Sequence, residues 1–252
     1  MRFADKIVII TGSGQGIGRV MAHAFAKEGA CVVIGDIKED CAQSVAVECR
    51  ELGSNALAIG LDISNKQSVK DFVARIIEKY GRIDVLINNA AVFSNIRRMG
   101  PFEEITDEEW DMLMSVNLKG IWLLTKEIVP YMKKQKYGKI INFGSGVSLE
   151  GRVGYLHYVA SKGGVVAMTR AMARELGDWN ITVNTIMPSM TITEIQRATM
   201  TSKQEAAAIN CRSIKRSQVP EDLVGPAMFF ASSDSDFVTG QSLAVNGGDT
   251  MQ

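Results

Sequence analysis

Short apolar runs rich in β-branched residues alternate along the chain with longer stretches in which apolar positions follow a helical period. Seven such runs stand at residues 7–10, 31–34, 56–61, 83–87, 140–143, 181–186 and 242–245. Continuous apolar runs are typical of strands that are buried on both faces, as in parallel sheets. The pattern therefore predicts an α/β fold in which a doubly wound, seven-stranded parallel sheet carries helices on both faces.

The intervening stretches indicate where helices begin and end. Phe72, Ile76 and Tyr80 recur every four residues and would share one helical face, and Gly81 follows where a helix commonly terminates. Thr106 stands three residues before a glutamate, which is the spacing of a capping box at the start of a helix. The basic run at 133–136 fits the carboxyl end of a helix, where cations interact favourably with the helix dipole.

The length of 252 residues suits one α/β domain, and no linker or internal repeat divides the chain. We therefore expect residues 1–252 to form a single domain. The segment 188–220, between the sixth and seventh predicted strands, is rich in threonine, methionine and alanine and does not follow the alternation. A long excursion at this place predicts a lid over a site, with a surface elaboration as the alternative.

Charge and composition exclude several classes of protein. The 28 lysines and arginines balance the 28 aspartates and glutamates, so nothing favours a nucleic-acid or anionic-membrane partner. The four cysteines and two histidines lack the spacing of a zinc site, and we expect no metal and reduced, buried thiols. No apolar run approaches the roughly 18 residues of a spanning helix, and the first residues lack a signal-like apolar stretch. We expect a soluble, cytoplasmic protein.

A glycine-rich turn, TGSGQGIG at residues 11–18, follows the first predicted strand and leads into a helix expected at 19–28. Glycines allow a tight turn and a close approach to a pyrophosphate, while the helix N-terminus offers N–H groups to the anion. We expect a dinucleotide to bind here through Gly12, Ser13, Gln15, Gly16, Ile17 and Gly18. The alternative, a turn without a ligand, would carry the conformational cost of four glycines for no gain.

Acidic residues follow the second and third predicted strands. Asp36 lies 18 positions after Gly18, close to the spacing at which a carboxylate accepts hydrogen bonds from an adenosine ribose. This carboxylate would repel a 2′-phosphate, and neither Gln15 nor Ile37 offers a cation, so we expect NAD rather than NADP. Asp62, followed by Ile63, could hold the adenine amino group. Asp36 could instead be a helix N-cap or a strand-end carboxylate without a ligand, and Asp62 could instead cap the helix that begins near residue 66.

The most informative stretch is Tyr158-Val159-Ala160-Ser161-Lys162, because residues four apart project from the same face of a helix. An adjacent ammonium favours the phenolate form of a tyrosine, which makes the phenol usable as a base. Such a pair alone is common on solvated helices. Its significance rises because Ser145 stands at the end of the fifth strand, at the sheet edge where ligands bind in open α/β proteins. Asn117 lies in a predicted helix, where asparagine has only middling propensity.

With these residues the chain resembles the short-chain dehydrogenase/reductase family over essentially its whole length. The matching motifs are Thr11-Gly12-x-x-x-Gly16-x-Gly18, Asp62, Asn88-Asn89-Ala90, Asn117, Ser145, Tyr158-x-x-x-Lys162, Asn184, Pro188, Thr239-Gly240-Gln241 and Asn246-Gly247-Gly248. The resemblance implies a Rossmann sheet of strand order 3-2-1-4-5-6-7, a nicotinamide cofactor and a homotetramer.

The resemblance also implies roles for the matching residues. Tyr158 would be the general acid/base, Ser145 would donate a hydrogen bond to the reacting oxygen, and Lys162 would lower the pKa of the tyrosine and hold the nicotinamide ribose. Asn117 would support a water that links Lys162 to solvent. Further cofactor contacts are expected at Asn89, Ala90, Pro188, Thr191 and Thr193. The chain departs from the family pattern at Ala91 and Ser189, where glycine is usual, and neither change removes a proton-transfer group.

The substrate is expected to be a hydrophobic or aryl secondary alcohol or ketone, oxidised or reduced with NAD. The expected pocket draws on 93–97, 147–153, Tyr155, Met187 and Met200, with substrate contacts at Phe93, Val147, Val153, His157 and Met190. For His157, a packing role at the rim of the pocket is favoured over a direct contact with the substrate. The sequence resembles aryl secondary-alcohol dehydrogenases of the 1-phenylethanol type within this family.

Four other functions are alternatives to this one. A 3-oxoacyl-carrier reductase and a sugar-alcohol dehydrogenase would share most of the motifs. A non-catalytic dinucleotide sensor would have no use for an intact Asn117, Ser145, Tyr158 and Lys162 set. A serine hydrolase is disfavoured because its nucleophile turn needs glycine at positions 143 and 147, where this chain has phenylalanine and valine.

Overall fold

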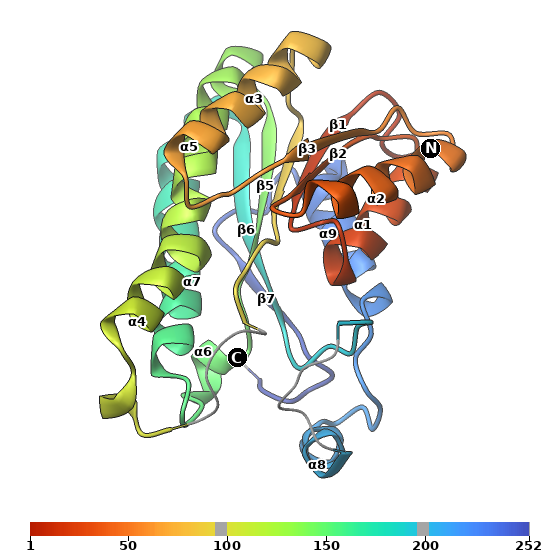
Figure 1. Cartoon of the computed structure of the whole chain (residues 1–252). Coiled ribbons are helices and arrows are strands. Elements are labelled where there is room, and N and C mark those ends of the chain that lie inside the picture. The colour runs from red at the N-terminus through yellow and green to blue at the C-terminus, as the bar shows by residue number, and fades with distance from the viewer. Residues whose placement is uncertain (94–99, 196–201, 252) are drawn as a thin grey trace.

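The computed structural model describes residues 1–93, 100–195 and 202–251. Its centre is one parallel sheet of seven strands in the order β3-β2-β1-β4-β5-β6-β7 (Figure 1). The strands are β1 (Ile7–Thr11), β2 (Cys31–Asp36), β3 (Leu57–Gly60), β4 (Val85–Asn88), β5 (Gly138–Phe143), β6 (Ile181–Pro188) and β7 (Ser242–Val245). The predicted fold class and strand order are therefore confirmed, and every predicted strand overlaps an observed one.

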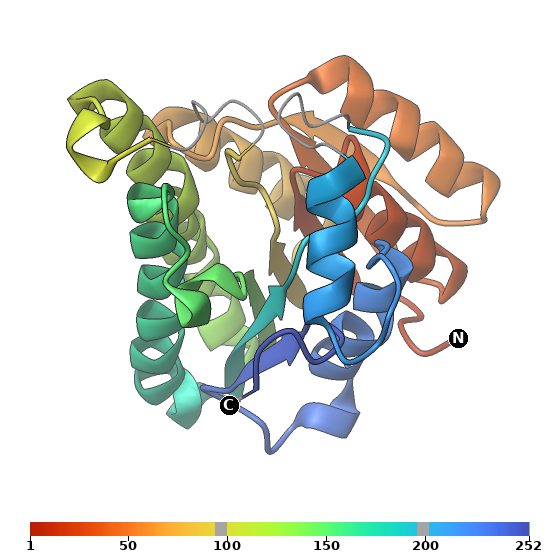
Figure 2. The same cartoon turned by 90° about the horizontal axis from the view of Figure 1, so that it is seen from below.

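Helices cover both faces of this sheet, as Figures 1 and 2 show from two directions. The α-helices are α1 (Gly16–Lys27), α2 (Glu39–Glu51), α3 (Lys66–Tyr80), α4 (Asp107–Met114), α5 (Ile121–Gln135), α6 (Val147–Glu150), α7 (Leu156–Leu176), α8 (Ser202–Cys211) and α9 (Glu221–Ala231). Helices α1, α2 and α9 pack on one face, and α3, α5 and α7 pack on the other.

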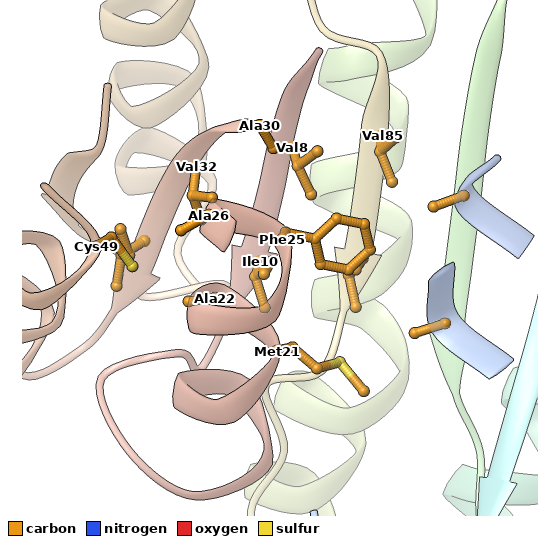
Figure 3. Close-up of a cluster of buried hydrophobic side chains, with 14 of the residues drawn as sticks. Val8, Ile10, Met21, Ala22, Phe25, Ala26, Ala30, Val32, Cys49 and Val85 are labelled. Atoms are coloured by element: carbon orange, nitrogen blue, oxygen red, sulfur yellow. The ribbon is translucent and has the colours of Figure 1, made fainter. Parts of the chain in front are cut away.

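The two hydrophobic cores show why these strands form. Successive side chains of a strand point to opposite faces, so Val8 and Ile10 join one core while Ile7 and Ile9 join the other. Figure 3 shows Val8 and Ile10 beside Phe25 of α1 in the first core. A strand buried on both sides needs apolar residues at every position, which explains the continuous apolar runs.

Local signals in the sequence mark several element boundaries. Helix α3 ends at Gly81, which adopts the left-handed conformation, and the capping box of Thr106 and Glu109 opens α4. The basic run at 133–136 spans the carboxyl end of α5, as expected. Helix α1 begins at Gly16, three residues earlier than the expected start.

Other expectations concern thiols, metals and membranes. All four cysteines are free thiols, but Cys49 alone is buried, so the expectation of buried thiols holds only in part. Within the described ranges, no group of three or more His, Cys, Asp or Glu side chains is arranged to hold a metal ion. In the same ranges, no helix is long and apolar enough to span a membrane.

Candidate functional site

The glycine-rich turn joins the end of β1 to the start of α1 and packs directly against the chain that follows β4. Gly12 has a φ of 61°, and a Cβ there would lie 2.8 Å from the Cα of Ala90. A Cβ on Gly18 would overlap the carbonyl oxygen of Gly12 and lie 2.6 Å from the Cα of Ser13. These two positions therefore require glycine, one for its conformation and both for the close approach of backbone.

Threonine and asparagine side chains lock this turn to β4. The Thr11 hydroxyl accepts hydrogen bonds from the backbone N–H groups of Asn89 (3.1 Å) and Ala90 (3.0 Å). In return, the Asn89 side chain donates to the carbonyl oxygens of Thr11 (2.9 Å) and Gly12 (3.0 Å). The side-chain amide of Asn89 is thus used to hold the shape of the turn.

The N-terminus of α1 presents an N–H group to an anion. Gly16 donates its backbone N–H to the carboxylate of Glu194 at 2.8 Å. A carboxylate oxygen and a phosphate oxygen are acceptors of the same kind, so the residues present fit the pyrophosphate of a dinucleotide. Ser13 faces inward instead, and its hydroxyl donates to the carbonyl oxygen of Ile10 at 2.6 Å.

Asp36, at the end of β2, lies beside the turn. Its carboxylate accepts hydrogen bonds from the backbone N–H groups of Gly14 (2.9 Å) and Lys38 (3.0 Å). Residue 38, rather than Asp36, occupies the N-cap position of α2. Each carboxylate oxygen accepts more than one hydrogen bond, so Asp36 keeps acceptor capacity for a ligand.

Asp62 follows β3 and lies in the same region. Its carboxylate accepts hydrogen bonds from the backbone N–H (2.9 Å) and the hydroxyl (2.6 Å) of Ser64. The N-cap of α3 is Asn65, whose side chain accepts from the backbone N–H groups of residues 67 and 68. The alternative interpretation of Asp62 as the cap of this helix is therefore wrong.

A cavity of about 420 Å³ runs along the carboxyl edge of the sheet and brings most of the predicted residues together. Of the predicted catalytic and cofactor-binding residues, those that line it are Gly12, Gln15, Gly16, Ile17, Asp36, Ile37, Asp62, Ile63, Asn89, Ala90, Ser145, Tyr158, Lys162, Pro188, Thr191 and Thr193. Ser13, Gly18 and Asn117 do not line it. They lie behind the wall of the cavity and shape it from there.

Ser145, Tyr158 and Lys162 converge on this cavity from two elements. Ser145 follows β5, while Tyr158 and Lys162 lie one turn apart on α7. The Lys162 ammonium is 5.9 Å from the centre of the Tyr158 ring and donates a hydrogen bond to the carbonyl oxygen of Phe143 at 2.8 Å. Lys162 is only 3% exposed, and this burial lowers the pKa of its ammonium to about 8.

Asn117 lies in a π-helical turn, Ser115–Gly120, between α4 and α5. Its side-chain oxygen accepts the backbone N–H of Val92 at 2.7 Å, and its amide donates to the Val92 carbonyl oxygen at 3.1 Å. π-Helical turns often occur at functional sites. Through this pair of hydrogen bonds Asn117 fixes Val92, which does line the cavity.

The expected substrate contacts divide into two groups. Phe93, Val147 and Met190 line the cavity, and the Phe93 ring lies 4.7 Å from that of Tyr158 and 5.9 Å from that of Tyr155. Val153 is 87% exposed and lies outside the cavity wall. Residues 94–97 and Met200 of the expected pocket lie outside the described residues, as does part of the segment 188–220.

His157 is also outside the cavity wall. It is 3% exposed, its Nδ1 atom has no hydrogen-bond partner within the described part of the chain, and burial lowers its pKa, opposed by the charge of Glu109. The structure therefore favours a packing role for His157 over a contact with substrate.

Two charged residues within the expected pocket stretch 147–153 were not singled out by any motif. Glu150 and Arg152 line the cavity near Tyr155, and burial together with the charge of Asp249 raises the pKa of Glu150. The exposed guanidinium of Arg152 lies 5.7 Å from the centre of the Tyr155 ring. Nothing in the local spacing of these residues distinguishes them from solvated surface charges.

A second group links the end of β6 to the carboxyl-terminal segment. The Ser189 hydroxyl donates to the carboxylate of Asp249 at 2.6 Å and accepts from Arg212 at 3.2 Å. Arg212 is 1% exposed and also donates to the Met190 carbonyl oxygen at 2.7 Å. The Gln218 side chain accepts from the Ser189 backbone N–H at 3.0 Å. This polar network, Ser189–Arg212–Gln218–Asp249, fixes the cavity wall at residues 188–191.

Comparisons with known proteins agree with this arrangement. A family model described as short chain dehydrogenase matches residues 6–204. The chain is 37% identical over 248 residues to a 3-oxoacyl-[acyl-carrier-protein] reductase of Thermotoga maritima, covering 98% of this chain and 99% of that protein. It is 37% identical over 246 residues to 5-keto-D-gluconate 5-reductase of Escherichia coli K12, covering 97% and 95%. The solved structure of levodione reductase superposes with a TM-score of 0.92 at 28% identity and covers 98% of both chains.

Proposed function

The chain belongs to the short-chain dehydrogenase/reductase family, and on that basis we propose that it transfers hydride reversibly between NAD and a hydrophobic or aryl secondary alcohol or ketone. Members of this family are oxidoreductases that act on CH–OH or keto groups with a nicotinamide dinucleotide. The observation that carries the proposal is the convergence of Ser145, Tyr158 and Lys162 on the cavity that also contains the glycine-rich turn.

Tyr158 takes the proton of the alcohol in oxidation and returns it to the carbonyl oxygen in reduction. The buried Lys162 ammonium next to the phenol ring favours the phenolate, because an opposite charge stabilises the ionised form. The Ser145 hydroxyl donates a hydrogen bond to the same substrate oxygen as charge develops on it. The nicotinamide, when bound, accepts or supplies the hydride. Asn117 contributes by holding Val92 and, in this proposal, supports the water that links Lys162 to solvent.

Asp36 supports the preference for NAD over NADP. Its carboxylate lies at the cavity wall beside Gln15 and Ile37, and neither neighbour carries a positive charge that would attract a 2′-phosphate. Like charges on the carboxylate and a 2′-phosphate repel each other, whereas a 2′-hydroxyl donates a hydrogen bond to the carboxylate.

Apolar and aromatic side chains support a hydrophobic substrate, since Phe93, Val147, Tyr155 and Met190 all line the cavity. A more polar substrate, such as a sugar alcohol or an acyl thioester, is the second candidate. Glu150 and Arg152 favour it because they place charges on the same wall, and two of the relatives are reductases of such substrates by name. A dinucleotide sensor without catalysis is the alternative from a different class.

The remaining proposals concern the whole chain. Residues 1–252 form one catalytic domain, supported by the participation of all seven strands in one sheet, and 188–220 act as a substrate lid, supported by the cavity contacts of its first residues. A homotetramer is supported by large apolar side chains left exposed on α4, α5 and α7, namely Trp110, Met112, Trp122 and Leu156. We place the protein in the cytoplasm.

The experiment that tests this function compares wild type with Tyr158→Phe on aryl alcohols, sugar alcohols and 3-oxoacyl thioesters, each with NAD(H) and NADP(H). We expect turnover of aryl substrates with NAD, a loss of about 10³-fold in kcat for Tyr158→Phe, and a change in NADH affinity of less than about 3-fold. Tyr131→Phe is the matched control, because Tyr131 lies near the carboxyl end of α5 and does not line the cavity. We expect its kcat to equal that of the wild type.

Each part of the proposal can fail separately. Retained turnover in Tyr158→Phe removes the tyrosine as acid/base. A preference for NADP contradicts the role given to Asp36. NADH binding without turnover of any substrate by the wild type indicates the sensor.

A further inference from the structure

Glu194 reaches the glycine-rich turn from a distant part of the chain. Its carboxylate accepts the backbone N–H of Gly16 at 2.8 Å, although the two residues are 178 positions apart. Gly16 is the first residue of α1, whose N-cap residue provides no side-chain hydrogen bond and whose first turn contains no acidic residue. Glu194 is therefore the negative charge that satisfies this helix N-terminus.

Residues next to Glu194 in the chain also pack against Gly16. A Cβ on Gly16 would lie 3.1 Å from the Cδ1 atom of Ile195 and 3.7 Å from the Cγ2 atom of Thr193. The charge of Glu194 also reaches Arg19, whose pKa is raised mainly by its hydrogen bond with Glu48 and further by Glu194. Residues 193–195 thus close over the turn, and Glu194 is the charged contact between them.

The same N–H group cannot serve two anions at once. In the proposed function, the pyrophosphate of the dinucleotide takes the N–H groups of this helix N-terminus. The Glu194 carboxylate uses one of them and, being negative, repels the phosphates in a site partly shielded from water. Binding of the dinucleotide therefore requires this carboxylate to leave Gly16.

We propose that Glu194 is an internal competitor of the cofactor pyrophosphate and lowers the affinity of the site for dinucleotides. This inference rests on the proposed function, because it assumes that a dinucleotide binds at the glycine-rich turn. It identifies Glu194 as a residue that lowers cofactor affinity by occupying an N–H group that the pyrophosphate needs.

The test uses Glu194→Gln, which keeps the size of the side chain and an amide oxygen as acceptor but removes the negative charge. Binding of NAD, NADH and inorganic pyrophosphate to the full-length protein is measured by titration calorimetry, together with adenosine as a phosphate-free probe. We expect Kd to fall about 3- to 10-fold for the three phosphate-containing probes and to stay unchanged for adenosine. A gain in affinity cannot result from partial misfolding, which lowers affinity.

The matched control is Glu175→Gln. Glu175 is exposed near the carboxyl end of α7 and does not line the cavity, so its charge lies outside the site. We expect its Kd values to equal those of the wild type.

The outcomes separate the inference from the proposed function. Unchanged or weaker binding of NADH and pyrophosphate to Glu194→Gln, while the wild type binds NADH, overturns the inference alone. Equal tightening for adenosine also overturns it, because the effect would not involve phosphate. Absence of dinucleotide binding in both proteins overturns the inference together with the proposed function.

Discussion

The two walls of the cavity are held by different kinds of contact. The wall formed by the glycine-rich turn and the ends of β1, β2 and β4 is fixed mainly by main-chain contacts, namely parallel strand pairing and the close approach of backbone at Gly12 and Gly18. The side chains of Thr11 and Asn89 add hydrogen bonds to neighbouring backbone atoms within this wall. The opposite wall, at residues 188–191, is fixed by side chains from remote positions, through the Ser189–Arg212–Gln218–Asp249 network.

Because of this difference, the two walls should tolerate different kinds of substitution. The wall at the glycine-rich turn, which we call the backbone-defined wall, has no room for an added Cβ where two main chains touch. Elsewhere it tolerates different side chains. A wall held by polar side chains depends on each partner being present, because an unpaired buried group costs free energy. Lys162 lies between the two, with its charge buried and its ammonium bonded to the carbonyl oxygen of Phe143.

The largest effect is expected for the pH dependence of stability at Lys162. Burial lowers its pKa to about 8, whereas in the unfolded chain it has the ordinary value of 10.5. Between these values the unfolded chain binds the proton more tightly, so the unfolding free energy of the wild type gains up to about 3 kcal/mol as pH rises from 8 to 10.5. Lys162→Met should lose this gain, measured by urea unfolding at several pH values.

Lys139→Met is the control for that experiment, because Lys139 is also buried but pairs with Asp236 at 2.7 Å. The gain should persist in this variant, since Lys162 remains present. An equal rise in Lys162→Met and in the wild type would show that the buried ammonium does not cause it.

The backbone-defined wall is tested by Gly18→Ala. A Cβ at this position meets the main chain of Gly12 and Ser13, and these atoms can move only by distorting the turn. We expect NADH to bind about 30-fold more weakly, equivalent to about 2 kcal/mol, as for other overpacked sites. Gly163→Ala, on α7, is the control because a Cβ there meets no atom within 4 Å. NADH affinity equal to that of the wild type in Gly18→Ala would contradict the comparison.

The side-chain-defined wall is tested by Ser189→Ala, which removes the hydroxyl between Arg212 and Asp249. We expect KM for the alcohol to rise about 5-fold, with kcat changed less than 2-fold, because the wall loses its fixed position while the proton-transfer groups remain.

The Ser189→Ala and Asp249→Asn substitutions combined should raise KM by less than the sum of their single effects in free energy, since the two residues share one hydrogen bond. Ser44→Ala, at an exposed position on α2 that does not line the cavity, is the control. Strictly additive effects would show that the network does not act as a unit.

Much of the fold and of the dinucleotide wall could be predicted from local patterns. The strands were visible because burial on both faces demands continuous apolar residues, as in Ile7 to Ile10. Gly12 and Gly16 could be recognised because a tight turn of this kind needs positive φ values, which favour glycine, and both residues have them. Tyr158 and Lys162 were visible because a helix places residues four apart on one face.

Other assignments needed the structure. His157 is next to Tyr158 in sequence, yet it points away from the cavity, because adjacent helical residues face different directions. Asp62 and Asn65 both suit a helix cap by residue type, and only the geometry of the loop shows that Asn65 takes this position. Asn117 lies in a π-helical turn that no spacing in the sequence indicates.

Local sequence was enough to predict the alternation of strands and helices, the glycine-rich turn and the shared helical face of Tyr158 and Lys162, because each depends on residues close together in the chain. Folding of the whole chain was needed to show that Glu194 bonds Gly16 and that Ser189 joins Arg212 to Asp249. These pairs are separated by 23 to 178 positions, and their contact depends on where the folded backbone brings distant segments together. The burial that lowers the pKa of Lys162 also depends on tertiary structure, since α7 carries its ammonium to the carbonyl oxygen of Phe143 at the end of β5.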